Sequence, residues 1–220
     1  MHENEKKLLE LVIDQYIKTW EPVGSKTLEG ILDIKLAPST IRKYLNLLEK
    51  KWLVYQPYNS AWRIPTVEGI ETYLNSVLVP DYQEFSPVKI KKRFGLRDFV
   101  EKLWEKVDGV AFGFYEDEKD IYYLWITKLL KKVNNDLEKI IPLMDFIETK
   151  QVITYLNKKE PEKGKVNYSF VNYQWVNIVL MYIWAKFDGD DAVIWTVSSL
   201  RVDYKSNIKI LETILEKWTI

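Results

Sequence analysis

One stretch of the sequence, Leu36–Thr66, constrains the fold more than any other, because it joins a helix signal, a strand signal and a basic loop. Pro38 suits the first turn of a helix, where its missing N–H is no loss. Apolar residues then recur at helical spacing and predict one buried stripe. They are Ile41, Tyr44, Leu45 and Leu48. The residues that follow predict a short strand, LVYQP, and a tight loop, YNSAWRIPT.

The face of this helix opposite the stripe is polar and basic. Between Pro38 and Thr66 there are five basic residues and one acid, Glu49, in a chain whose formal net charge is zero. A basic helix followed by a basic hairpin is the plan of a winged helix-turn-helix, in which the helix enters the major groove and the wing contacts phosphates. By composition alone, a basic helix face is usually an ordinary solvated face, and the order of the elements is what favours DNA binding. The candidate DNA-binding residues are Ser39, Thr40, Arg42, Lys43, Asn46 and Arg63.

Three segments of this region resemble the N-terminal domain of the heat-inducible transcription repressor HrcA family. They are EPVGSKTL (Glu21–Leu28), PSTIRKYLNLLEKKWLVYQP (Pro38–Pro57) and SAWRIPT (Ser60–Thr66). The resemblance covers the first third of the chain. It implies that Thr40 and Arg42 carry over directly as DNA contacts, and that the wing arginine is kept as Arg63.

The sequence also departs from the family pattern within the same helix. Lys43 and Tyr44 replace the family's Asn-Asp pair, so base reading by Lys43 does not follow from the resemblance. Ala37 occupies the place of the family's capping serine, which weakens the helix cap by about 1 kcal/mol. These departures leave open a second interpretation, a winged-helix interaction or regulatory module that no longer binds the family's operator.

Tryptophan stands at three positions where the family carries glycine, namely Trp20, Trp52 and Trp62. The first two follow predicted helix ends, where a left-handed backbone is usual. Trp62 falls at the tip of the wing, where a tight turn also favours positive φ. The chain has 9 tryptophans and only 8 glycines, whereas glycine usually makes up about 7% of residues. One hypothesis is that the source genome reads UGA as glycine; the alternative is true tryptophans in a diverged relative.

The second half of the chain shows a different pattern, because from Gly109 the apolar residues alternate. VAFGFY and IYYLWI, separated by the acidic turn EDEKD, predict a hairpin, and VNYSFVNY, VNIVLMYIWAKF and AVIWTVSSL predict three more strands. Helices are expected over Asn135–Leu156, interrupted or kinked near Pro142, and over Tyr204–Trp218. A sheet flanked by helices implies an α+β fold.

The predicted domain organisation follows from these patterns. Residues 1–79 form the winged helix-turn-helix, residues 80–107 a linker and connecting helix, and residues 108–220 the α+β domain. Pro80–Pro87 gives the best linker signal, with two prolines among polar residues. AVIWTVSSLRVDYKSNIKIL and IYYLWITKLL resemble the GAF-like C-terminal domain of the same family. The chain is shorter than typical members, and the missing length matches their inserted dimerisation subdomain, so the dimer geometry stays open.

Enzymatic function is not expected. There are no cysteines, and the one histidine, His2, lies at the N-terminus, which argues against thiolate chemistry, disulfides and a histidine-dependent catalytic site. A winged-helix enzyme such as a biotin ligase is the alternative, but the sequence has no glycine-rich nucleotide loop, nucleophile motif or metal-ligand cluster. We therefore expect no cofactor and no metal.

The expected partners come from the resemblance. It implies a repressor of heat-shock (chaperone) genes that binds an inverted-repeat operator in double-stranded DNA as a homodimer, with a chaperonin as a further partner. No apolar run approaches 18 residues, so we expect no membrane insertion and a cytoplasmic location.

Overall fold

The computed structural model describes residues 1–31, 36–58, 62–77, 95–115, 122–124, 137–156, 162–187 and 190–218. The chain divides into two compact units, Met1–Pro80 and Asp81–Ile220. Together they give the expected mixture of helices and antiparallel strands, an α+β fold. The predicted linker Pro80–Pro87, Trp125 and most of the basic run from Lys89 to Arg97 lie outside the described residues. No helix within the described ranges is long and apolar enough to cross a membrane.

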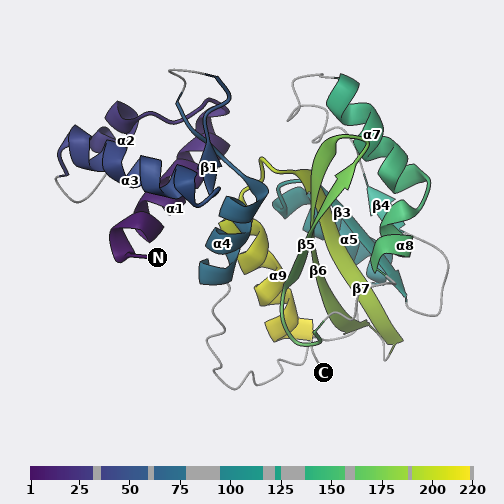
Figure 1. Cartoon of the computed structure of the whole chain (residues 1–220). Helices are drawn as coiled ribbons and strands as arrows, with labels where there is room; N and C mark the ends of the chain where they lie inside the picture. The colour runs from purple at the N-terminus through teal and green to yellow at the C-terminus, as the bar shows by residue number, and fades with distance from the viewer. Residues whose placement is uncertain are drawn as a thin grey trace. The chain divides into compact units, whose positions relative to one another are not determined.

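The described residues of the first unit form four helices and one small hairpin (Figure 1). In chain order they are α1 (Glu3–Thr19), α2 (Ser25–Ile31), α3 (Pro38–Lys50), β1 (Val54–Tyr55), β2 (Ile64–Pro65) and α4 (Val67–Val77). The two strands pair antiparallel, with Val54 opposite Pro65 and Tyr55 opposite Ile64. The helix and the short strand predicted for Leu36–Thr66 are therefore confirmed, and α3 begins at Pro38 as expected. The predicted loop contains β2 near its end, and residues 59–61 lie outside the described residues.

The core of this unit forms between α1 and α3, which pack against each other. Buried apolar side chains line both helices, and those of α3 belong to its predicted stripe: Leu8, Leu9, Val12, Ile13, Ile41, Leu45 and Leu48. Burying each such side chain contributes about 1.5–3 kcal/mol. Helix α4 packs closely on the chain that follows α3, because a Cβ added at Gly69 would lie 2.0 Å from the carbonyl oxygen of Leu53. The stripe of α3 thus turns inward, and its basic face remains outside.

The second unit is built on a five-stranded antiparallel sheet in the order β4-β3-β7-β6-β5. Its elements are α5 (Leu96–Lys106), β3 (Val110–Tyr115), β4 (Tyr122–Leu124), α7 (Leu137–Glu148), α8 (Gln151–Leu156), β5 (Asn167–Tyr173), β6 (Val176–Phe187), β7 (Asp190–Ser199) and α9 (Tyr204–Trp218). Strands β3 to β6 lie within the segments where alternation predicts them, and β7 begins at Asp190, two residues before the predicted segment AVIWTVSSL. Helix α9 has the predicted bounds.

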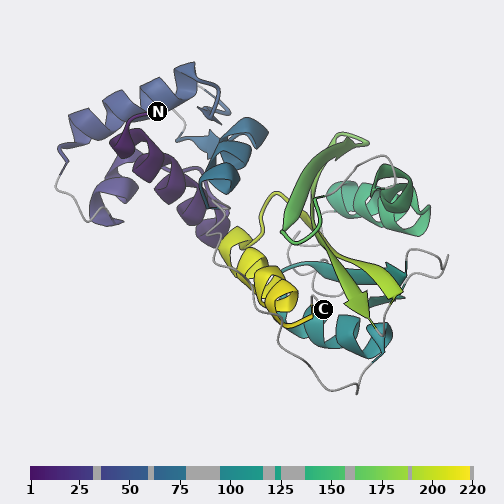
Figure 2. The same cartoon turned by 90° about the horizontal axis from the view of Figure 1, so that it is seen from below.

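Helices cover both faces of this sheet (Figures 1 and 2). Helices α7 and α8 pack on one face, over a core centred on Trp195, whose ring stacks on Phe112 at 4.2 Å between centroids. Helices α5 and α9 pack on the other face. There α5 approaches β3 so closely that a Cβ at Gly113 would lie 2.7 Å from a methyl group of Val100.

The helical segment before β5 breaks at a different place from the one predicted. Helix α7 continues through Pro142, and the interruption falls at Thr149–Lys150. Lys150 has φ 57°, and a left-handed residue cannot continue a right-handed helix. The break therefore follows from the backbone at Lys150 and not from the proline.

The segment RVDY, singled out for its resemblance, has a structural role at the start of α9. Asp203 Oδ1 accepts the N–H of Ser206 at 2.9 Å, and the Tyr204 hydroxyl donates to the carbonyl of Leu200 at 2.7 Å. Asn207, fully buried, accepts the N–H of Asp108 at 2.8 Å and donates to its carbonyl at 3.0 Å. The two hydrogen bonds of Asn207 connect α9 to the chain that enters β3.

Candidate nucleic-acid interface

The outer face of α3 carries most of the predicted DNA-binding residues. Ser39, Arg42, Lys43 and Asn46 are exposed there, and Thr40 is partly buried. The side chains of Arg42 and Lys43 form no ion pair with any residue that the structure describes. Both side chains are exposed on the face of α3 opposite its buried stripe, where an anion in solution can reach them.

Arg63 lies beside this face and is held in place by α3. Its Nη2 lies 3.1 Å from Glu49 Oε2 and also donates to Asn46 Oδ1, and its Nε donates to Glu49 Oε2 at 3.2 Å. Asn46 and Glu49 are one helical turn apart, so both face the same side of α3. Only 12% of the Arg63 side chain is exposed. Of the six predicted residues, Asn46 and Arg63 are thus brought into direct contact.

The backbone of Arg63 makes a second connection. Its N–H donates to the carbonyl of Val23 at 3.0 Å, and its carbonyl accepts the N–H of Val23 at 2.8 Å. Val23 belongs to the turn between α1 and α2. Arg63 therefore joins the hairpin, α3 and this turn, which fixes where the hairpin lies relative to the exposed face of α3.

Thr66 holds the other end of the hairpin. Its hydroxyl accepts the N–H of Gly69 at 2.9 Å, which caps α4, and donates to the carbonyl of Trp52 at 2.5 Å. Its own N–H donates to the carbonyl of Leu53 at 3.1 Å. Sequence reasoning did not single out Thr66 or the contact between Glu49 and Arg63. The available signal for the cap was a threonine placed directly before the helix, because threonine is a favoured N-cap residue.

An ion pair between a buried carboxylate and an exposed ammonium group links the start of α1 to the end of α3. Glu5 Oε2 lies 2.6 Å from Lys51 Nζ and also accepts the N–H of His2 at 3.1 Å, while the Glu5 side chain is only 2% exposed. The hydrogen bond from Lys51 is the largest cause of a pKa for Glu5 below its usual value, and burial opposes it. The charge of Lys51 is thus paired with Glu5, although the side chain is 44% exposed. Arg42, Lys43 and Lys50 are the exposed basic residues of α3.

The backbone expectations for the three tryptophans are met at two positions. Trp20 has φ 66° and Trp52 has φ 58°, both left-handed as predicted. The expectation for Trp62 is wrong, because Trp62 is not among the described residues with positive φ. It leads into the extended segment where Arg63 pairs with Val23. Its indole lies instead against Gly24, where a Cβ would come within 2.9 Å of the ring.

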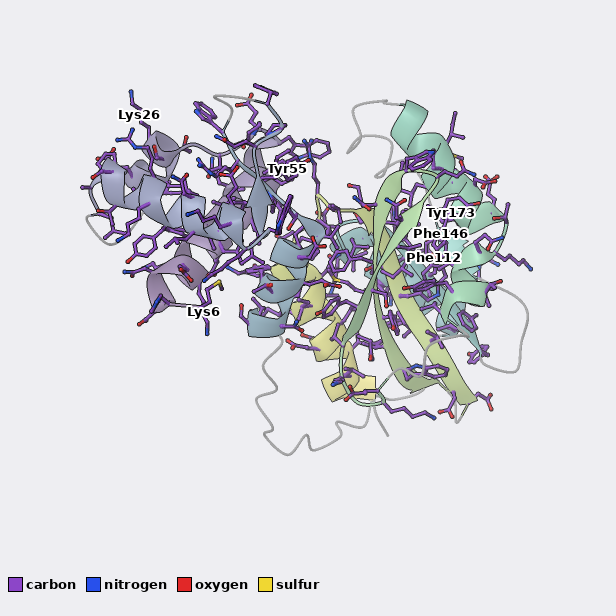
Figure 3. All side chains as sticks on the ribbon, viewed as in Figure 1. Lys6, Lys26, Tyr55, Phe112, Phe146 and Tyr173 are labelled. Atoms are coloured by element: carbon purple, nitrogen blue, oxygen red, sulfur yellow. The ribbon has the colours of Figure 1, made fainter. Side chains whose placement is uncertain are left out.

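Figure 3 shows the side chains of this unit, with exposed Lys6 on α1 and Lys26 on α2 projecting from different sides of it. Lys6 lies on a helix whose apolar stripe packs against the inward side of α3. It therefore offers a cation outside the face formed by Arg42 and Lys43, which makes it suitable as a control position.

Sequence comparison finds relatives for part of the chain. The protein named "Heat-inducible transcription repressor HrcA" from Thermosynechococcus vestitus is 33% identical over 96 residues, which are 43% of this chain and 27% of that protein. The HrcA of Desulfitobacterium hafniense is 40% identical over 78 residues, or 36% of this chain and 23% of that protein. The chain thus spans about a quarter of the length of these curated relatives. No family model matches the sequence.

The relationship to HrcA that the motifs predict is thereby confirmed for the matched segment, as a partial and diverged one. Structural comparison adds a crystal structure described as a hypothetical protein, with a TM-score of 0.74 over 98% of this chain and 95% of that one. The two sequences are 16% identical, so this likeness establishes a shared fold and nothing about function.

Proposed function

We propose, from the relationship of its matched segment to the HrcA repressors, that this chain is a DNA-binding transcriptional repressor of heat-shock genes. In this proposal the first unit is a winged helix-turn-helix, with α3 as the recognition helix and the β1–β2 hairpin as the wing. The observation that carries it is the exposed pair Arg42 and Lys43 on α3, which has no acidic partner among the described residues.

The proposed contacts divide into two kinds. Arg42 and Lys43 supply the charge that neutralises phosphates and displaces their counterions. Ser39, Thr40 and Asn46 supply uncharged donors and acceptors, which suit phosphate oxygens or base edges in the major groove. These residues lie on the outer face of α3. That position supports the proposed roles, because an α-helix enters the major groove with one face turned to the bases.

For Arg63 we propose a positioning role in the free protein and a phosphate contact in the complex. Its bonds to Asn46 and Glu49 hold the wing against α3 before DNA arrives. A phosphate is a bidentate partner for a guanidinium, as is the carboxylate of Glu49. DNA binding can thus exchange one acceptor for another without leaving the charge unpaired.

The remaining parts of the proposal concern assembly. The second unit is a GAF-like domain, and two chains form a dimer on an inverted-repeat operator, because a two-fold protein matches a palindromic site and doubles its contacts. A chaperonin is proposed as a further partner, on the family resemblance alone.

A gel-shift titration tests this function. The duplexes are an inverted repeat from upstream of chaperone genes in the same genome and a scrambled duplex of equal composition, each at two salt concentrations. Specific binding to the inverted repeat that weakens as salt rises supports the proposal. Equal binding to both duplexes, or binding to neither by folded protein, would reject the repressor function for that operator and favour an interaction module.

A further inference from the structure

We infer that positions 20, 52 and 175 hold glycine in the source organism, although the sequence assigns tryptophan to each. The inference rests on the backbone, which at all three positions has the left-handed conformation that a residue without a side chain adopts freely. It does not depend on the function proposed above.

Position 52 closes α3 with a complete Schellman motif. The N–H of Trp52 bonds to the carbonyl of Glu49 at 2.9 Å, and the N–H of Leu53 bonds to the carbonyl of Leu48 at 3.0 Å. In this motif the residue at C′, here Trp52 with φ 58°, is usually glycine. The accompanying apolar contact is also available, because Leu48 and Leu53 are both buried.

Position 20 ends α1 in the simpler left-handed way. Trp20 has φ 66° and ψ 13°, and its N–H bonds to the carbonyl of Tyr16 at 2.9 Å. Pro22 follows two residues later, a common place for proline beyond a helix end. Glycine is again the usual residue at this position, because a Cβ is unfavourable in a left-handed backbone.

Position 175 lies in a β-hairpin turn, whereas positions 20 and 52 lie at helix ends. Tyr173 pairs with Val176 across a two-residue loop between β5 and β6, and the loop residues Gln174 and Trp175 have φ 46° and 68°. Positive φ at both central residues defines a type I′ turn, whose preferred sequence is Asn-Gly. Tryptophan therefore occupies the position of the turn at which glycine is preferred.

At positions 52 and 175 the side chain contributes little to offset this backbone conformation. The Trp175 residue is 95% exposed and Trp52 is 73% exposed, so most of each indole faces water and contributes little burial energy. Trp125 lies outside the described residues; of the other eight tryptophans, three are left-handed. Positive φ is found in a few per cent of non-glycine residues and is an outlier for bulky ones.

Two other residues, Lys150 and Gln174, also have positive φ. Neither weakens the inference, because the tryptophans occupy motif positions that prefer glycine, and Gln174 shares its turn with Trp175. A genome that reads UGA as glycine produces this pattern when its UGA codons are translated as tryptophan. UGG still encodes tryptophan in such a genome, so true tryptophans remain where they fill a core, as the buried ring of Trp195 does.

The decisive experiment reads the residues directly. The protein is purified from the source organism, digested, and its peptides covering positions 20, 52 and 175 are sequenced by tandem mass spectrometry, beside sequencing of the codons. Glycine at all three positions with UGA codons is the expected result. Tryptophan at any of them, or a UGG codon there, overturns the inference.

A stability experiment tests the physical basis separately, on recombinant protein made as written. Trp175→Gly and Trp52→Gly should each raise the ratio of folded to unfolded protein roughly five- to thirty-fold, since a left-handed Cβ costs about this much. Trp104→Gly, in the interior of α5, is the matched control and should lower the ratio. A lowered ratio for Trp175→Gly, whose indole is exposed, would overturn the inference.

Discussion

The guanidinium of Arg63 and the carboxylate of Glu49 form an ion pair at 3.1 Å that joins the hairpin of the first unit to α3. Arg63 is largely buried and Glu49 partly so, and Asn46 accepts a further hydrogen bond from the same guanidinium. Helix α3 therefore positions the hairpin through Glu49, which is the acid of the basic segment. The proposed wing and recognition helix form one structural element.

A double-mutant cycle measures this pair. With Arg63→Ala, Glu49→Ala and the double variant, we expect a coupling free energy of about 1 kcal/mol in urea unfolding, since the pair is only partly shielded from water. Arg63→Lys should not restore it, because lysine cannot reach both acceptors with a planar fork. Additive single effects would show that Arg63 does not position the hairpin through Glu49.

The Glu5–Lys51 pair predicts a pH dependence. The pKa of Glu5 is lowered in the folded state, chiefly by the hydrogen bond from Lys51. The stabilisation that ionised Glu5 contributes to the folded state is therefore fully present above its unfolded pKa of about 4.3. This stabilisation is lost as the pH falls through the folded pKa of Glu5. Glu5→Gln should destabilise the protein at about pH 7 and much less at an acid pH below the folded pKa of Glu5, where the carboxylate is protonated. An equal deficit at both values would contradict this account.

Thr66 should contribute through its hydroxyl. Thr66→Val keeps the shape of the side chain but removes the cap on Gly69 and the bond to the carbonyl of Trp52. We expect a loss of about 1–2 kcal/mol in the free energy of unfolding. Thr66→Ser keeps both bonds and should lose less, and an equal loss in the two variants would assign the effect to packing of the methyl group.

Asn207 should be important in the second unit. Asn207→Leu removes two hydrogen bonds to the backbone of Asp108 and leaves those groups without their buried partner. The expected loss is about 2–4 kcal/mol in the free energy of unfolding. Asn207→Asp keeps the acceptor, loses the donor and buries a carboxylate, so its loss in neutral solution should exceed that of the missing bond alone. A change below about 0.5 kcal/mol for Asn207→Leu would show that water replaces the amide.

The sequence predicted those elements whose pattern is local. The bounds of α9 and the start of α3 follow from apolar spacing and from Pro38, because one face of each helix must be buried. The strands were predicted by alternation for the same reason. Exposure of Arg42 and Lys43 also follows from spacing, since they lie opposite the buried stripe of α3.

Contacts between distant segments could not be predicted in this way. The partners of Arg63 lie on another element, and no local pattern relates a loop arginine to Asn46, Glu49 or Val23. The type I′ turn at Gln174–Trp175 was detectable in principle, because two predicted strands are separated by two residues. The tryptophan concealed it, since the usual Asn-Gly signal is absent.

The central claim is that the exposed face of α3 binds DNA phosphates. The most direct test is the slope of log affinity against log salt for the inverted-repeat duplex, measured by fluorescence anisotropy. Arg42→Ala and Lys43→Ala should each make the slope shallower by about one, with unchanged unfolding free energy, and Lys6→Ala should leave it as it is. An unchanged slope in the Arg42→Ala, Lys43→Ala double variant would contradict the claim and place any DNA contact elsewhere.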